Sequence, residues 1–242
     1  TARQIEERLA KELEINLSLK LEKLESGKYK VSGKGELHLA VLLETLRREG
    51  YEVEVGKPEV IYKIIDGQKC EPYEDVNIVA PQEYLGTITQ EVGKRLGVLS
   101  HMDPVSDKEV EFVYKMPTRA ILGLRSLLLT ATKGTVIFNS QFLDFEPVGE
   151  NLPKMRRGVL IATNSGEALS YGLQAAQERG STFVEPADAI YEGQIVGANA
   201  KAEDFLESDE LLEITPKNLR LRKKYLTQVE RRRHRDEIKN TY

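Results

Sequence analysis

The alternation of apolar and polar residues divides the first sixty positions into five short elements. Ile5, Leu9 and Leu13 recur on one face of the first element, as in an amphipathic helix. The pattern predicts a helix, two strands, a helix and a strand at residues 2–14, 15–21, 29–32, 37–48 and 51–55, with Gly50 ending the second helix. One more strand ahead of residue 1 would complete the βαββαβ ferredoxin-like order, so we expect the sequence to begin inside or at the edge of its first domain.

The same order of elements recurs about 80 residues further along the chain. The pattern there predicts a strand, a helix, a hairpin, a helix and a strand at residues 76–79, 84–96, 98–115, 119–132 and 135–145. The first of these helices carries Leu85, Ile88, Val92 and Leu96 on one face. A second ferredoxin-like domain is therefore expected, with little repetition of the sequence itself.

The last third of the chain is predicted to be rich in β structure. Short strands separated by Gly, Asn and Pro are expected at residues 159–163, 168–173, 190–196 and 219–222. The fold class expected from the whole pattern is α+β, with two ferredoxin-like α/β sandwich domains followed by a β-rich domain and a basic tail. The expected domains cover residues 1–66, 67–148 and 149–242.

Charge is distributed unevenly along the 242 residues, whose net charge is −4. From Lys217 onward ten basic residues face three acidic ones, so this segment carries about +7 and the remainder about −11. A basic tail on an acidic body favours an anionic partner, although a solvated terminal helix would show the same pattern. The single cysteine, Cys70, suits a reducing cytoplasm, and no apolar run or signal peptide predicts a membrane or secretory location.

Candidate catalytic chemistry is sparse in this sequence. The segment Gly33-Lys34-Gly35 lacks the Gly-Lys-Ser/Thr end of a P-loop and the third glycine of a dinucleotide motif. No Asn-Lys-x-Asp motif for guanine is present, and the three histidines, His38, His101 and His234, lie far apart in the sequence. The chain itself is expected to bind no GTP, cofactor or metal and to catalyse no reaction, and His38 is expected to be a packed helix residue.

Two groups of motifs resemble elongation factor G. The run Gly33-x-Gly35-Glu36-Leu37-His38-Leu39, followed by Arg47-Arg48-Glu49 and Pro58, is similar to its third domain. Glu71-Pro72, residues 80–86 and Gly134 are similar to its fifth domain. Only about a dozen residues separate the two groups, so the fourth domain of elongation factor G has no room here.

This direct connection, together with the last third of the chain, resembles the BipA/TypA family of translational GTPases. The segments that carry this likeness are residues 157–161, 168–179, 191–197, 209–216 and 219–223. Two features depart from the family pattern. Thr118-Arg119-Ala120 stands where the family has Ser-Arg-Gly, and Asp204 is followed directly by Phe205 where the family carries a longer basic loop. We expect that loop to be missing from the sequence as given.

The resemblance implies the ribosome-binding C-terminal half of a GTPase whose GTP and magnesium sites lie in an absent N-terminal domain. It implies a cytoplasmic protein, monomeric as a fragment, that acts in large-subunit assembly and in stress or cold adaptation, with the large subunit, its rRNA and tRNA as partners and no membrane contact. Two alternatives remain open from the residues alone: a non-enzymatic RNA-binding module and a protein-interaction scaffold. The predicted sheets lack the central aromatic pair of an RRM, which disfavours the former.

Basic residues are the candidates for contact with RNA phosphates. They are Lys154, Arg156 and Arg157 at the junction of the last domain, and Lys217, Arg220, Arg222, Lys223, Lys224, Arg231, Arg232 and Arg233 in the tail. Arg119 and Arg125 are weaker candidates, since both could be structural residues on a helix surface. Strand alternation predicts Arg220 and Arg222 on the face opposite Leu219 and Leu221. The following basic helix is expected to become ordered on RNA.

Overall fold

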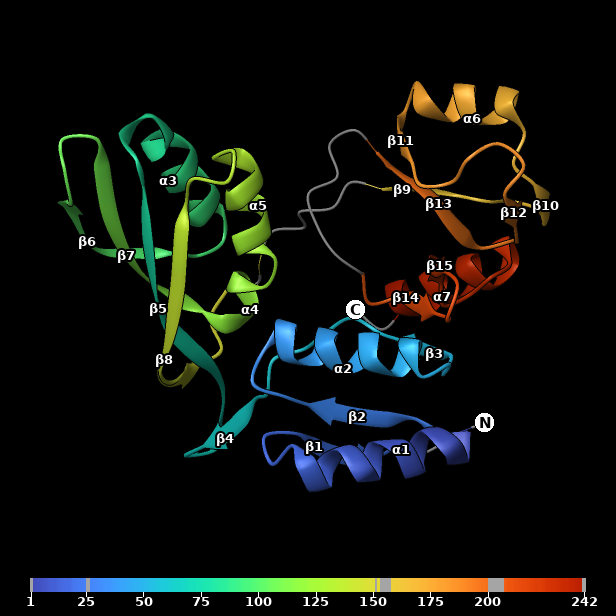
Figure 1. The fold of residues 1–242 in the computed structure, drawn as a ribbon, viewed down its shortest axis with the longest axis horizontal. Helices are drawn as coiled ribbons and strands as arrows, with labels where there is room; N and C mark the ends of the chain where they lie inside the picture. The colour runs from blue at the N-terminus through green and yellow to red at the C-terminus, as the bar shows by residue number, and fades with distance from the viewer. Residues whose placement is uncertain (1, 25–26, 151, 153–157, 200–206, 241–242) are drawn as a thin grey trace. The chain divides into compact units, whose positions relative to one another are not determined.

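The computed structural model describes residues 2–24, 27–150, 152, 158–199 and 207–240 (Figure 1). The chain forms two compact units. One contains Thr1–Pro58 together with Arg157–Tyr242, and the other contains Glu59–Arg156. The structure therefore groups the first and last parts of the chain in one unit, whereas the predicted domains were consecutive. Among the described residues, no helix is both long enough and apolar enough to cross a bilayer.

The first part of the divided unit has the predicted order of elements. Helix α1 (Ala2–Ile15) is followed by strands β1 (Lys20–Lys23) and β2 (Tyr29–Ser32), helix α2 (Glu36–Arg48) and strand β3 (Val53–Val55). Strands β1 and β2 form an antiparallel hairpin. The core of this part consists of four leucines: Leu9 in α1, Leu19 immediately before β1, and Leu42 and Leu46 in α2. The helical period therefore identified Leu9, Leu42 and Leu46 as buried. The strand predicted at residues 15–21 was wrong for most of its length, because α1 continues to Ile15 and β1 begins only at Lys20, which leaves Ile15 and Leu17 83% and 92% exposed.

Strand β3 pairs with β14 (Glu210–Ile214), which lies more than 150 residues further along the chain. In a ferredoxin-like sheet, the first strand lies between the third and the last. No described strand occupies that position between β2 and β3, and the described partner of β3 is β14. This long-range pairing joins the two sequence segments of the unit.

The second unit is a ferredoxin-like domain, as predicted. Its elements are β4 (Lys63–Ile65), β5 (Gln68–Pro81), the short 3₁₀ helix η2 (Gln82–Tyr84), α3 (Leu85–Lys94), β6 (Val98–Pro104), β7 (Glu109–Pro117), α4 (Thr118–Ile121), α5 (Leu124–Ala131) and β8 (Ile137–Pro147). Strands β8, β5, β7 and β6 are neighbours in that order, and all their pairings are antiparallel. Helices α3 and α5 lie on one face of this sheet (Figure 1). The core between the layers includes Val76, Ile78, Ile88, Phe112 and Leu128.

The helix expected at residues 119–132 is divided into α4 and α5. Gly123 separates them with a φ of 73°, a left-handed backbone angle that glycine adopts without the steric penalty of a Cβ atom. Ala120 in α4 is completely buried. The guanidinium of Arg95, itself buried, donates to the carbonyls of Ala120 at 3.3 Å and Leu122 at 2.9 Å. Arg95 thus satisfies carbonyl groups at the point where α4 ends.

The last part of the chain is β-rich, with one correction. Its elements are β9 (Val159–Ile161), β10 (Gly166–Glu167), α6 (Ser170–Gln177), β11 (Gly180–Thr182), β12 (Ala189–Ile190), β13 (Gln194–Asn199), β14, β15 (Leu219–Lys223) and α7 (Gln228–Asn240). The sheet order is β11-β13-β15-β14-β3, and β9 also pairs with β13. The predicted strand at residues 168–173 was wrong, because most of it belongs to helix α6. Residues 173–177 of α6 are Leu, Gln and Ala, which favour helices.

The core position of Leu42 leads to a testable prediction. Replacing Leu42 with Ala is expected to lower the free energy of unfolding by about 2–5 kcal/mol, because a buried leucine is truncated and leaves a cavity. Val41, the preceding residue, is exposed on the same helix, so V41A is the matched control. Urea unfolding followed by circular dichroism measures both variants. Equal midpoints for L42A and V41A would contradict the assigned helix face.

Candidate nucleic-acid interface

The cations predicted to contact RNA occupy very different environments in the structure. Among the tail residues, the exposed ones are Lys217, Lys224, Arg232 and Arg233, while Arg220, Arg222 and Arg231 are half-buried and Lys223 is buried. Lys154, Arg156 and Arg157 lie outside the described residues, as does the Asp204–Phe205 junction. The basic residues that are neighbours in the sequence of the tail are therefore divided between the surface and the interior of the protein.

Arg222 joins strands that are distant in sequence. Its guanidinium contacts the carboxylates of Glu54 at 2.5 Å and Glu213 at 2.9 Å, so it links β15 to β3 and β14. Tyr191 donates its hydroxyl hydrogen to the other oxygen of Glu213 at 2.7 Å. Burial and this hydrogen bond raise the pKa of Tyr191. In this conformation Arg222 helps to hold the two segments of its unit together.

Lys223 lies among three carboxylates. Its ammonium nitrogen is 2.9 Å from Glu210, 3.0 Å from Asp209 and 3.5 Å from Glu207. Burial opposes the charged ammonium, but its hydrogen bonds to Glu210 and Asp209 outweigh that effect and raise the pKa of Lys223. These three carboxylates are close enough together to suggest a cation site. The lysine ammonium already neutralises part of their charge, so the group is best described as an internal ion cluster.

The expected two-faced arrangement of β15 is only partly correct. Leu219, Leu221 and Lys223 share one face by strand alternation, yet Leu219 is exposed and Lys223 is buried. The reason is positional: the strand begins at the surface and ends beside Asp209. Register pairs Leu219 with Ile214 and Lys223 with Glu210 across the β14–β15 pair. The burial of a β15 side chain therefore depends on its position along the strand as well as on the face of the sheet that it occupies.

Helix α7 is fixed at its N-terminus by contacts within the chain. The Thr227 hydroxyl accepts from the Glu230 N–H at 3.3 Å, and Glu230 accepts from the Thr227 N–H at 3.0 Å, which forms a capping box. The hydrogen bond from the Thr227 backbone N–H, and after it that from the Thr227 hydroxyl, lowers the pKa of Glu230. The ring of His234 lies 4.4 Å from that of Tyr225. The start of α7 is thus specified by this chain's own residues, whereas its charge pattern predicted that RNA would be required.

The charged surface of α7 consists of arginines that follow this anchored turn. Arg231 donates to the carbonyls of Tyr225, at 3.2 Å, and Leu226, so its guanidinium has a structural role. Arg232, Arg233 and Arg235 are exposed. Arg235 is one of the ten basic residues of the tail, and its spacing of three residues from Arg232 places both on one side of the helix.

The two weaker candidates for RNA contact, Arg119 and Arg125, also lie in different environments. Arg119 is largely buried, and its Nε lies 2.5 Å from a carboxylate oxygen of Glu71, which is completely buried. A second nitrogen of Arg119 donates to the carbonyl of Glu150 at 2.5 Å. Arg125 is exposed on α5. The structural role of Arg119 is therefore supported, and Arg125 has no such contacts in the part of the chain that the structure describes.

The motif around His38 has a structural explanation. The N–H of Lys34 donates to Nδ1 of His38 at 3.1 Å, and the side-chain amide of Asn16 lies 2.7 Å from Nε2. A Cβ atom at Gly33 would lie only 2.9 Å from Nδ1, so glycine permits the close approach of the ring. The prediction that His38 is a packed helix residue is supported by these contacts. It connects the glycine turn to the end of α1.

Comparison with known proteins covers most of the chain. Residues 68–156 match the family model "Elongation factor G C-terminus", and residues 157–206 match "TypA/BipA C-terminal domain". Proteins named large ribosomal subunit assembly factor BipA are 37% identical in Bacillus subtilis (strain 168), 36% in Escherichia coli (strain K12) and 36% in Haemophilus influenzae, each over 96% of this chain. The chain spans 44–45% of the length of these relatives. The Bacillus alignment extends over 271 positions, more than the 242 residues present here, so the relative carries additional residues.

Proposed function

Because this chain belongs to the TypA/BipA family, we propose that it docks on the large ribosomal subunit and acts in the assembly of that subunit. The observation that carries this proposal is the similarity, over nearly the whole chain, to proteins named large ribosomal subunit assembly factors. The relatives are longer, so GTP binding and hydrolysis are proposed for a complete protein of this family. We place the protein in the cytoplasm, and a role in stress or cold adaptation belongs to the same proposal.

The proposed contact with ribosomal RNA is made by the exposed basic set, which comprises Lys217, Lys224, Arg232, Arg233 and Arg235. RNA helices are bound largely through their shape and phosphates, and exposed lysine and arginine side chains supply the matching charge. Arg222, Lys223 and Arg231 have contacts within the protein, as described above. We propose that they support this surface, while Arg220, Lys154, Arg156 and Arg157 remain further candidates for contact.

Neutralising the exposed basic set is expected to weaken docking and reduce its salt dependence. The slope of log affinity against log salt should fall by roughly 0.7–0.9 for every phosphate that the variant no longer neutralises. The variant replaces all five residues of the set with Gln and leaves Arg222 and Lys223 intact. Co-sedimentation with purified large subunits across a salt series measures affinity, and circular dichroism checks the fold.

The control removes the same amount of charge from a different surface. Five lysines that are exposed in the first part of the chain are changed to Gln: Lys11, Lys20, Lys28, Lys30 and Lys34. This variant should retain more affinity and a steeper salt slope. If the two variants bound equally at every salt concentration, the tail would be a solvated end and docking would depend on another surface.

A further inference from the structure

A second surface, here called the α6 lobe, comprises residues 163–192 around helix α6. Three of its large apolar side chains are strongly exposed: Leu169 by 72%, Tyr171 by 85% and Phe183 by 54%. Leu169 and Tyr171 flank Ser170 at the start of α6, and Ser170 lines the same cavity as Phe183. Exposed apolar groups gathered in this way mark interaction surfaces more often than scattered single residues do.

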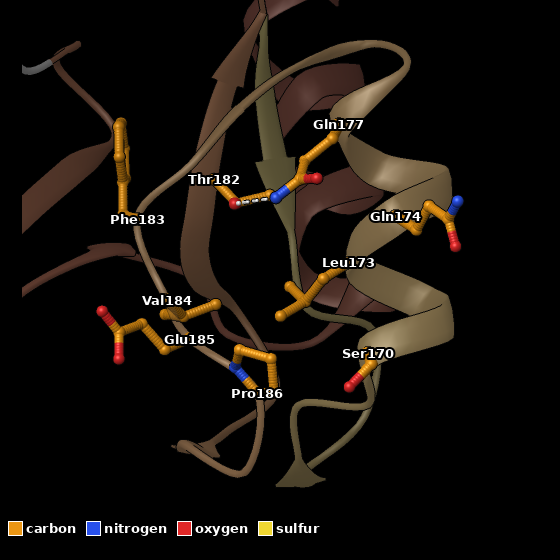
Figure 2. A pocket seen from close by; sticks show the side chains of 9 residues that line it. All are labelled: Ser170, Leu173, Gln174, Gln177, Thr182, Phe183, Val184, Glu185 and Pro186. Atoms are coloured by element: carbon orange, nitrogen blue, oxygen red, sulfur yellow. Dashed lines mark hydrogen bonds between the residues drawn. The ribbon is translucent and has the colours of Figure 1, made fainter.

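The cavity lies between α6 and the loop that follows β11, and its volume is about 590 Å³. Figure 2 shows the side chains of Leu173 and Val184 directed toward each other within it. The amide of Gln177 donates to the Thr182 hydroxyl at 3.3 Å, which closes one end. Phe183 and Glu185 point away from the helix (Figure 2). The lobe therefore offers a recess of mixed polar and apolar lining, with the exposed side chains of Leu169, Tyr171 and Phe183 around it.

The charge of the lobe limits the chemistry of its partner. It carries one basic residue, Arg179, and five acidic residues: Glu167, Glu178, Glu185, Asp188 and Glu192. None of these carboxylates forms an ion pair with Lys or Arg in the described residues. Unpaired carboxylates repel phosphate and attract lysine and arginine.

We propose that the α6 lobe binds a lysine- and arginine-rich segment of a partner protein. Tyr171 and Leu169 would anchor the apolar parts of that segment, and the carboxylates would pair with its cationic ends. This surface differs from the exposed basic set in both charge and chemistry, so one chain presents separate faces to RNA and to basic protein. The choice of ribosomal proteins as the partner to test rests on the proposed function.

Photo-crosslinking tests the assignment directly. A benzophenone amino acid replaces Tyr171 in the full chain, and the control carries it at Leu17, which is also highly exposed. After binding to purified large subunits and irradiation, mass spectrometry should identify position-171 crosslinks in Lys- and Arg-rich protein segments. Crosslinks only to rRNA, or none above the position-17 control, would overturn the proposal.

Co-sedimentation is read before irradiation, which separates the two proposals. If the chain fails to pellet with the subunit, the proposed function is contradicted. The α6 lobe is then tested separately, with proteins that high salt extracts from large subunits. In that titration, fluorescence anisotropy of the labelled chain should give a midpoint about tenfold higher for Y171S than for the unmodified chain. The same shift is expected when Glu167, Glu178 and Glu185 are changed together to Gln.

Matched variants exclude a general attraction between an acidic protein and polycations. L17S removes an exposed apolar side chain elsewhere, and the joint change of Glu22, Glu52 and Glu59 to Gln removes three exposed carboxylates elsewhere. Both should leave the midpoint within about twofold of the original. Midpoints that shift equally in lobe and control variants, or in neither, would refute specific binding by the lobe.

Discussion

Replacing Glu71 with Ala is expected to lower the free energy of unfolding of the second unit by about 3–5 kcal/mol. Glu71 has no solvent exposure, and its carboxylate contacts Arg119 at 2.5 Å and accepts from the Gly149 N–H at 3.3 Å. Removing it leaves a largely buried guanidinium and a backbone N–H without this partner. Buried charges without their counterion are strongly destabilising because neither water nor the protein interior solvates them adequately.

Urea unfolding, with hydrogen exchange of the β5 and β7 amides, measures this destabilisation in the unit concerned. Glu146 is the matched control, because it forms an ion pair with Lys115 nearby that is substantially exposed. E146A should change stability by at most about 1 kcal/mol. Replacing both members of the buried pair by Leu in one chain should recover much of the stability. Similar effects of E71A and E146A would show that burial does not control the strength of the Glu71–Arg119 pair.

Replacing Phe112 with Ala is expected to destabilise the same unit by about 3–5 kcal/mol. Phe112 is only 1% exposed on β7, within the core between sheet and helices, and its ring stacks near that of Tyr114 with centroids 6.1 Å apart. Truncation removes this packing and leaves a cavity that close-packed neighbours can fill only in part.

Phe142 provides the control for this substitution. It lies on β8 of the same sheet but is 54% exposed, and its ring lies 5.5 Å from that of Phe145, so F142A removes much less buried area than F112A does. Its expected effect is about 1 kcal/mol or less, below that of F112A. Thermal unfolding followed by circular dichroism compares the two variants. Equal destabilisation would argue that the core between sheet and helices is assigned to the wrong face.

The environment of the tail cations determines how RNA binding should be tested. Positive charge along the sequence alone would favour reversing Arg220, Arg222 and Lys224 together. Arg222 bridges Glu54 and Glu213, so reversing its charge would disturb the pairing of β3, β14 and β15 as well as any RNA contact. Restricting substitutions to exposed cations separates binding from folding, since affinities can then be compared at an unchanged stability.

Local patterns in the sequence determined the order of most elements and several of the buried faces. Helical and strand periods depend on residues a few positions apart, so the Leu42 face of α2 and the alternating core residues of β7 could be predicted. Two features were missed. The left-handed turn at Gly123 divides a segment whose pattern predicted one longer helix, and the helix propensity of α6 was outweighed by a pattern typical of a strand. The family likeness was likewise carried by residue identity and spacing.

Tertiary structure alone decided which charges lie inside. Glu71 and Arg119 are 48 positions apart, and Arg222 and Glu54 are 168 apart, so no local pattern relates either pair. Lysine and arginine have the same charge whether they face solvent or a buried carboxylate. The fold determines which of these occurs by bringing distant strands into register, as β14 does with β3 and β15. A basic sequence therefore identified the candidates for RNA contact, and long-range packing determined which of them remain exposed, because burial is a property of the assembled chain.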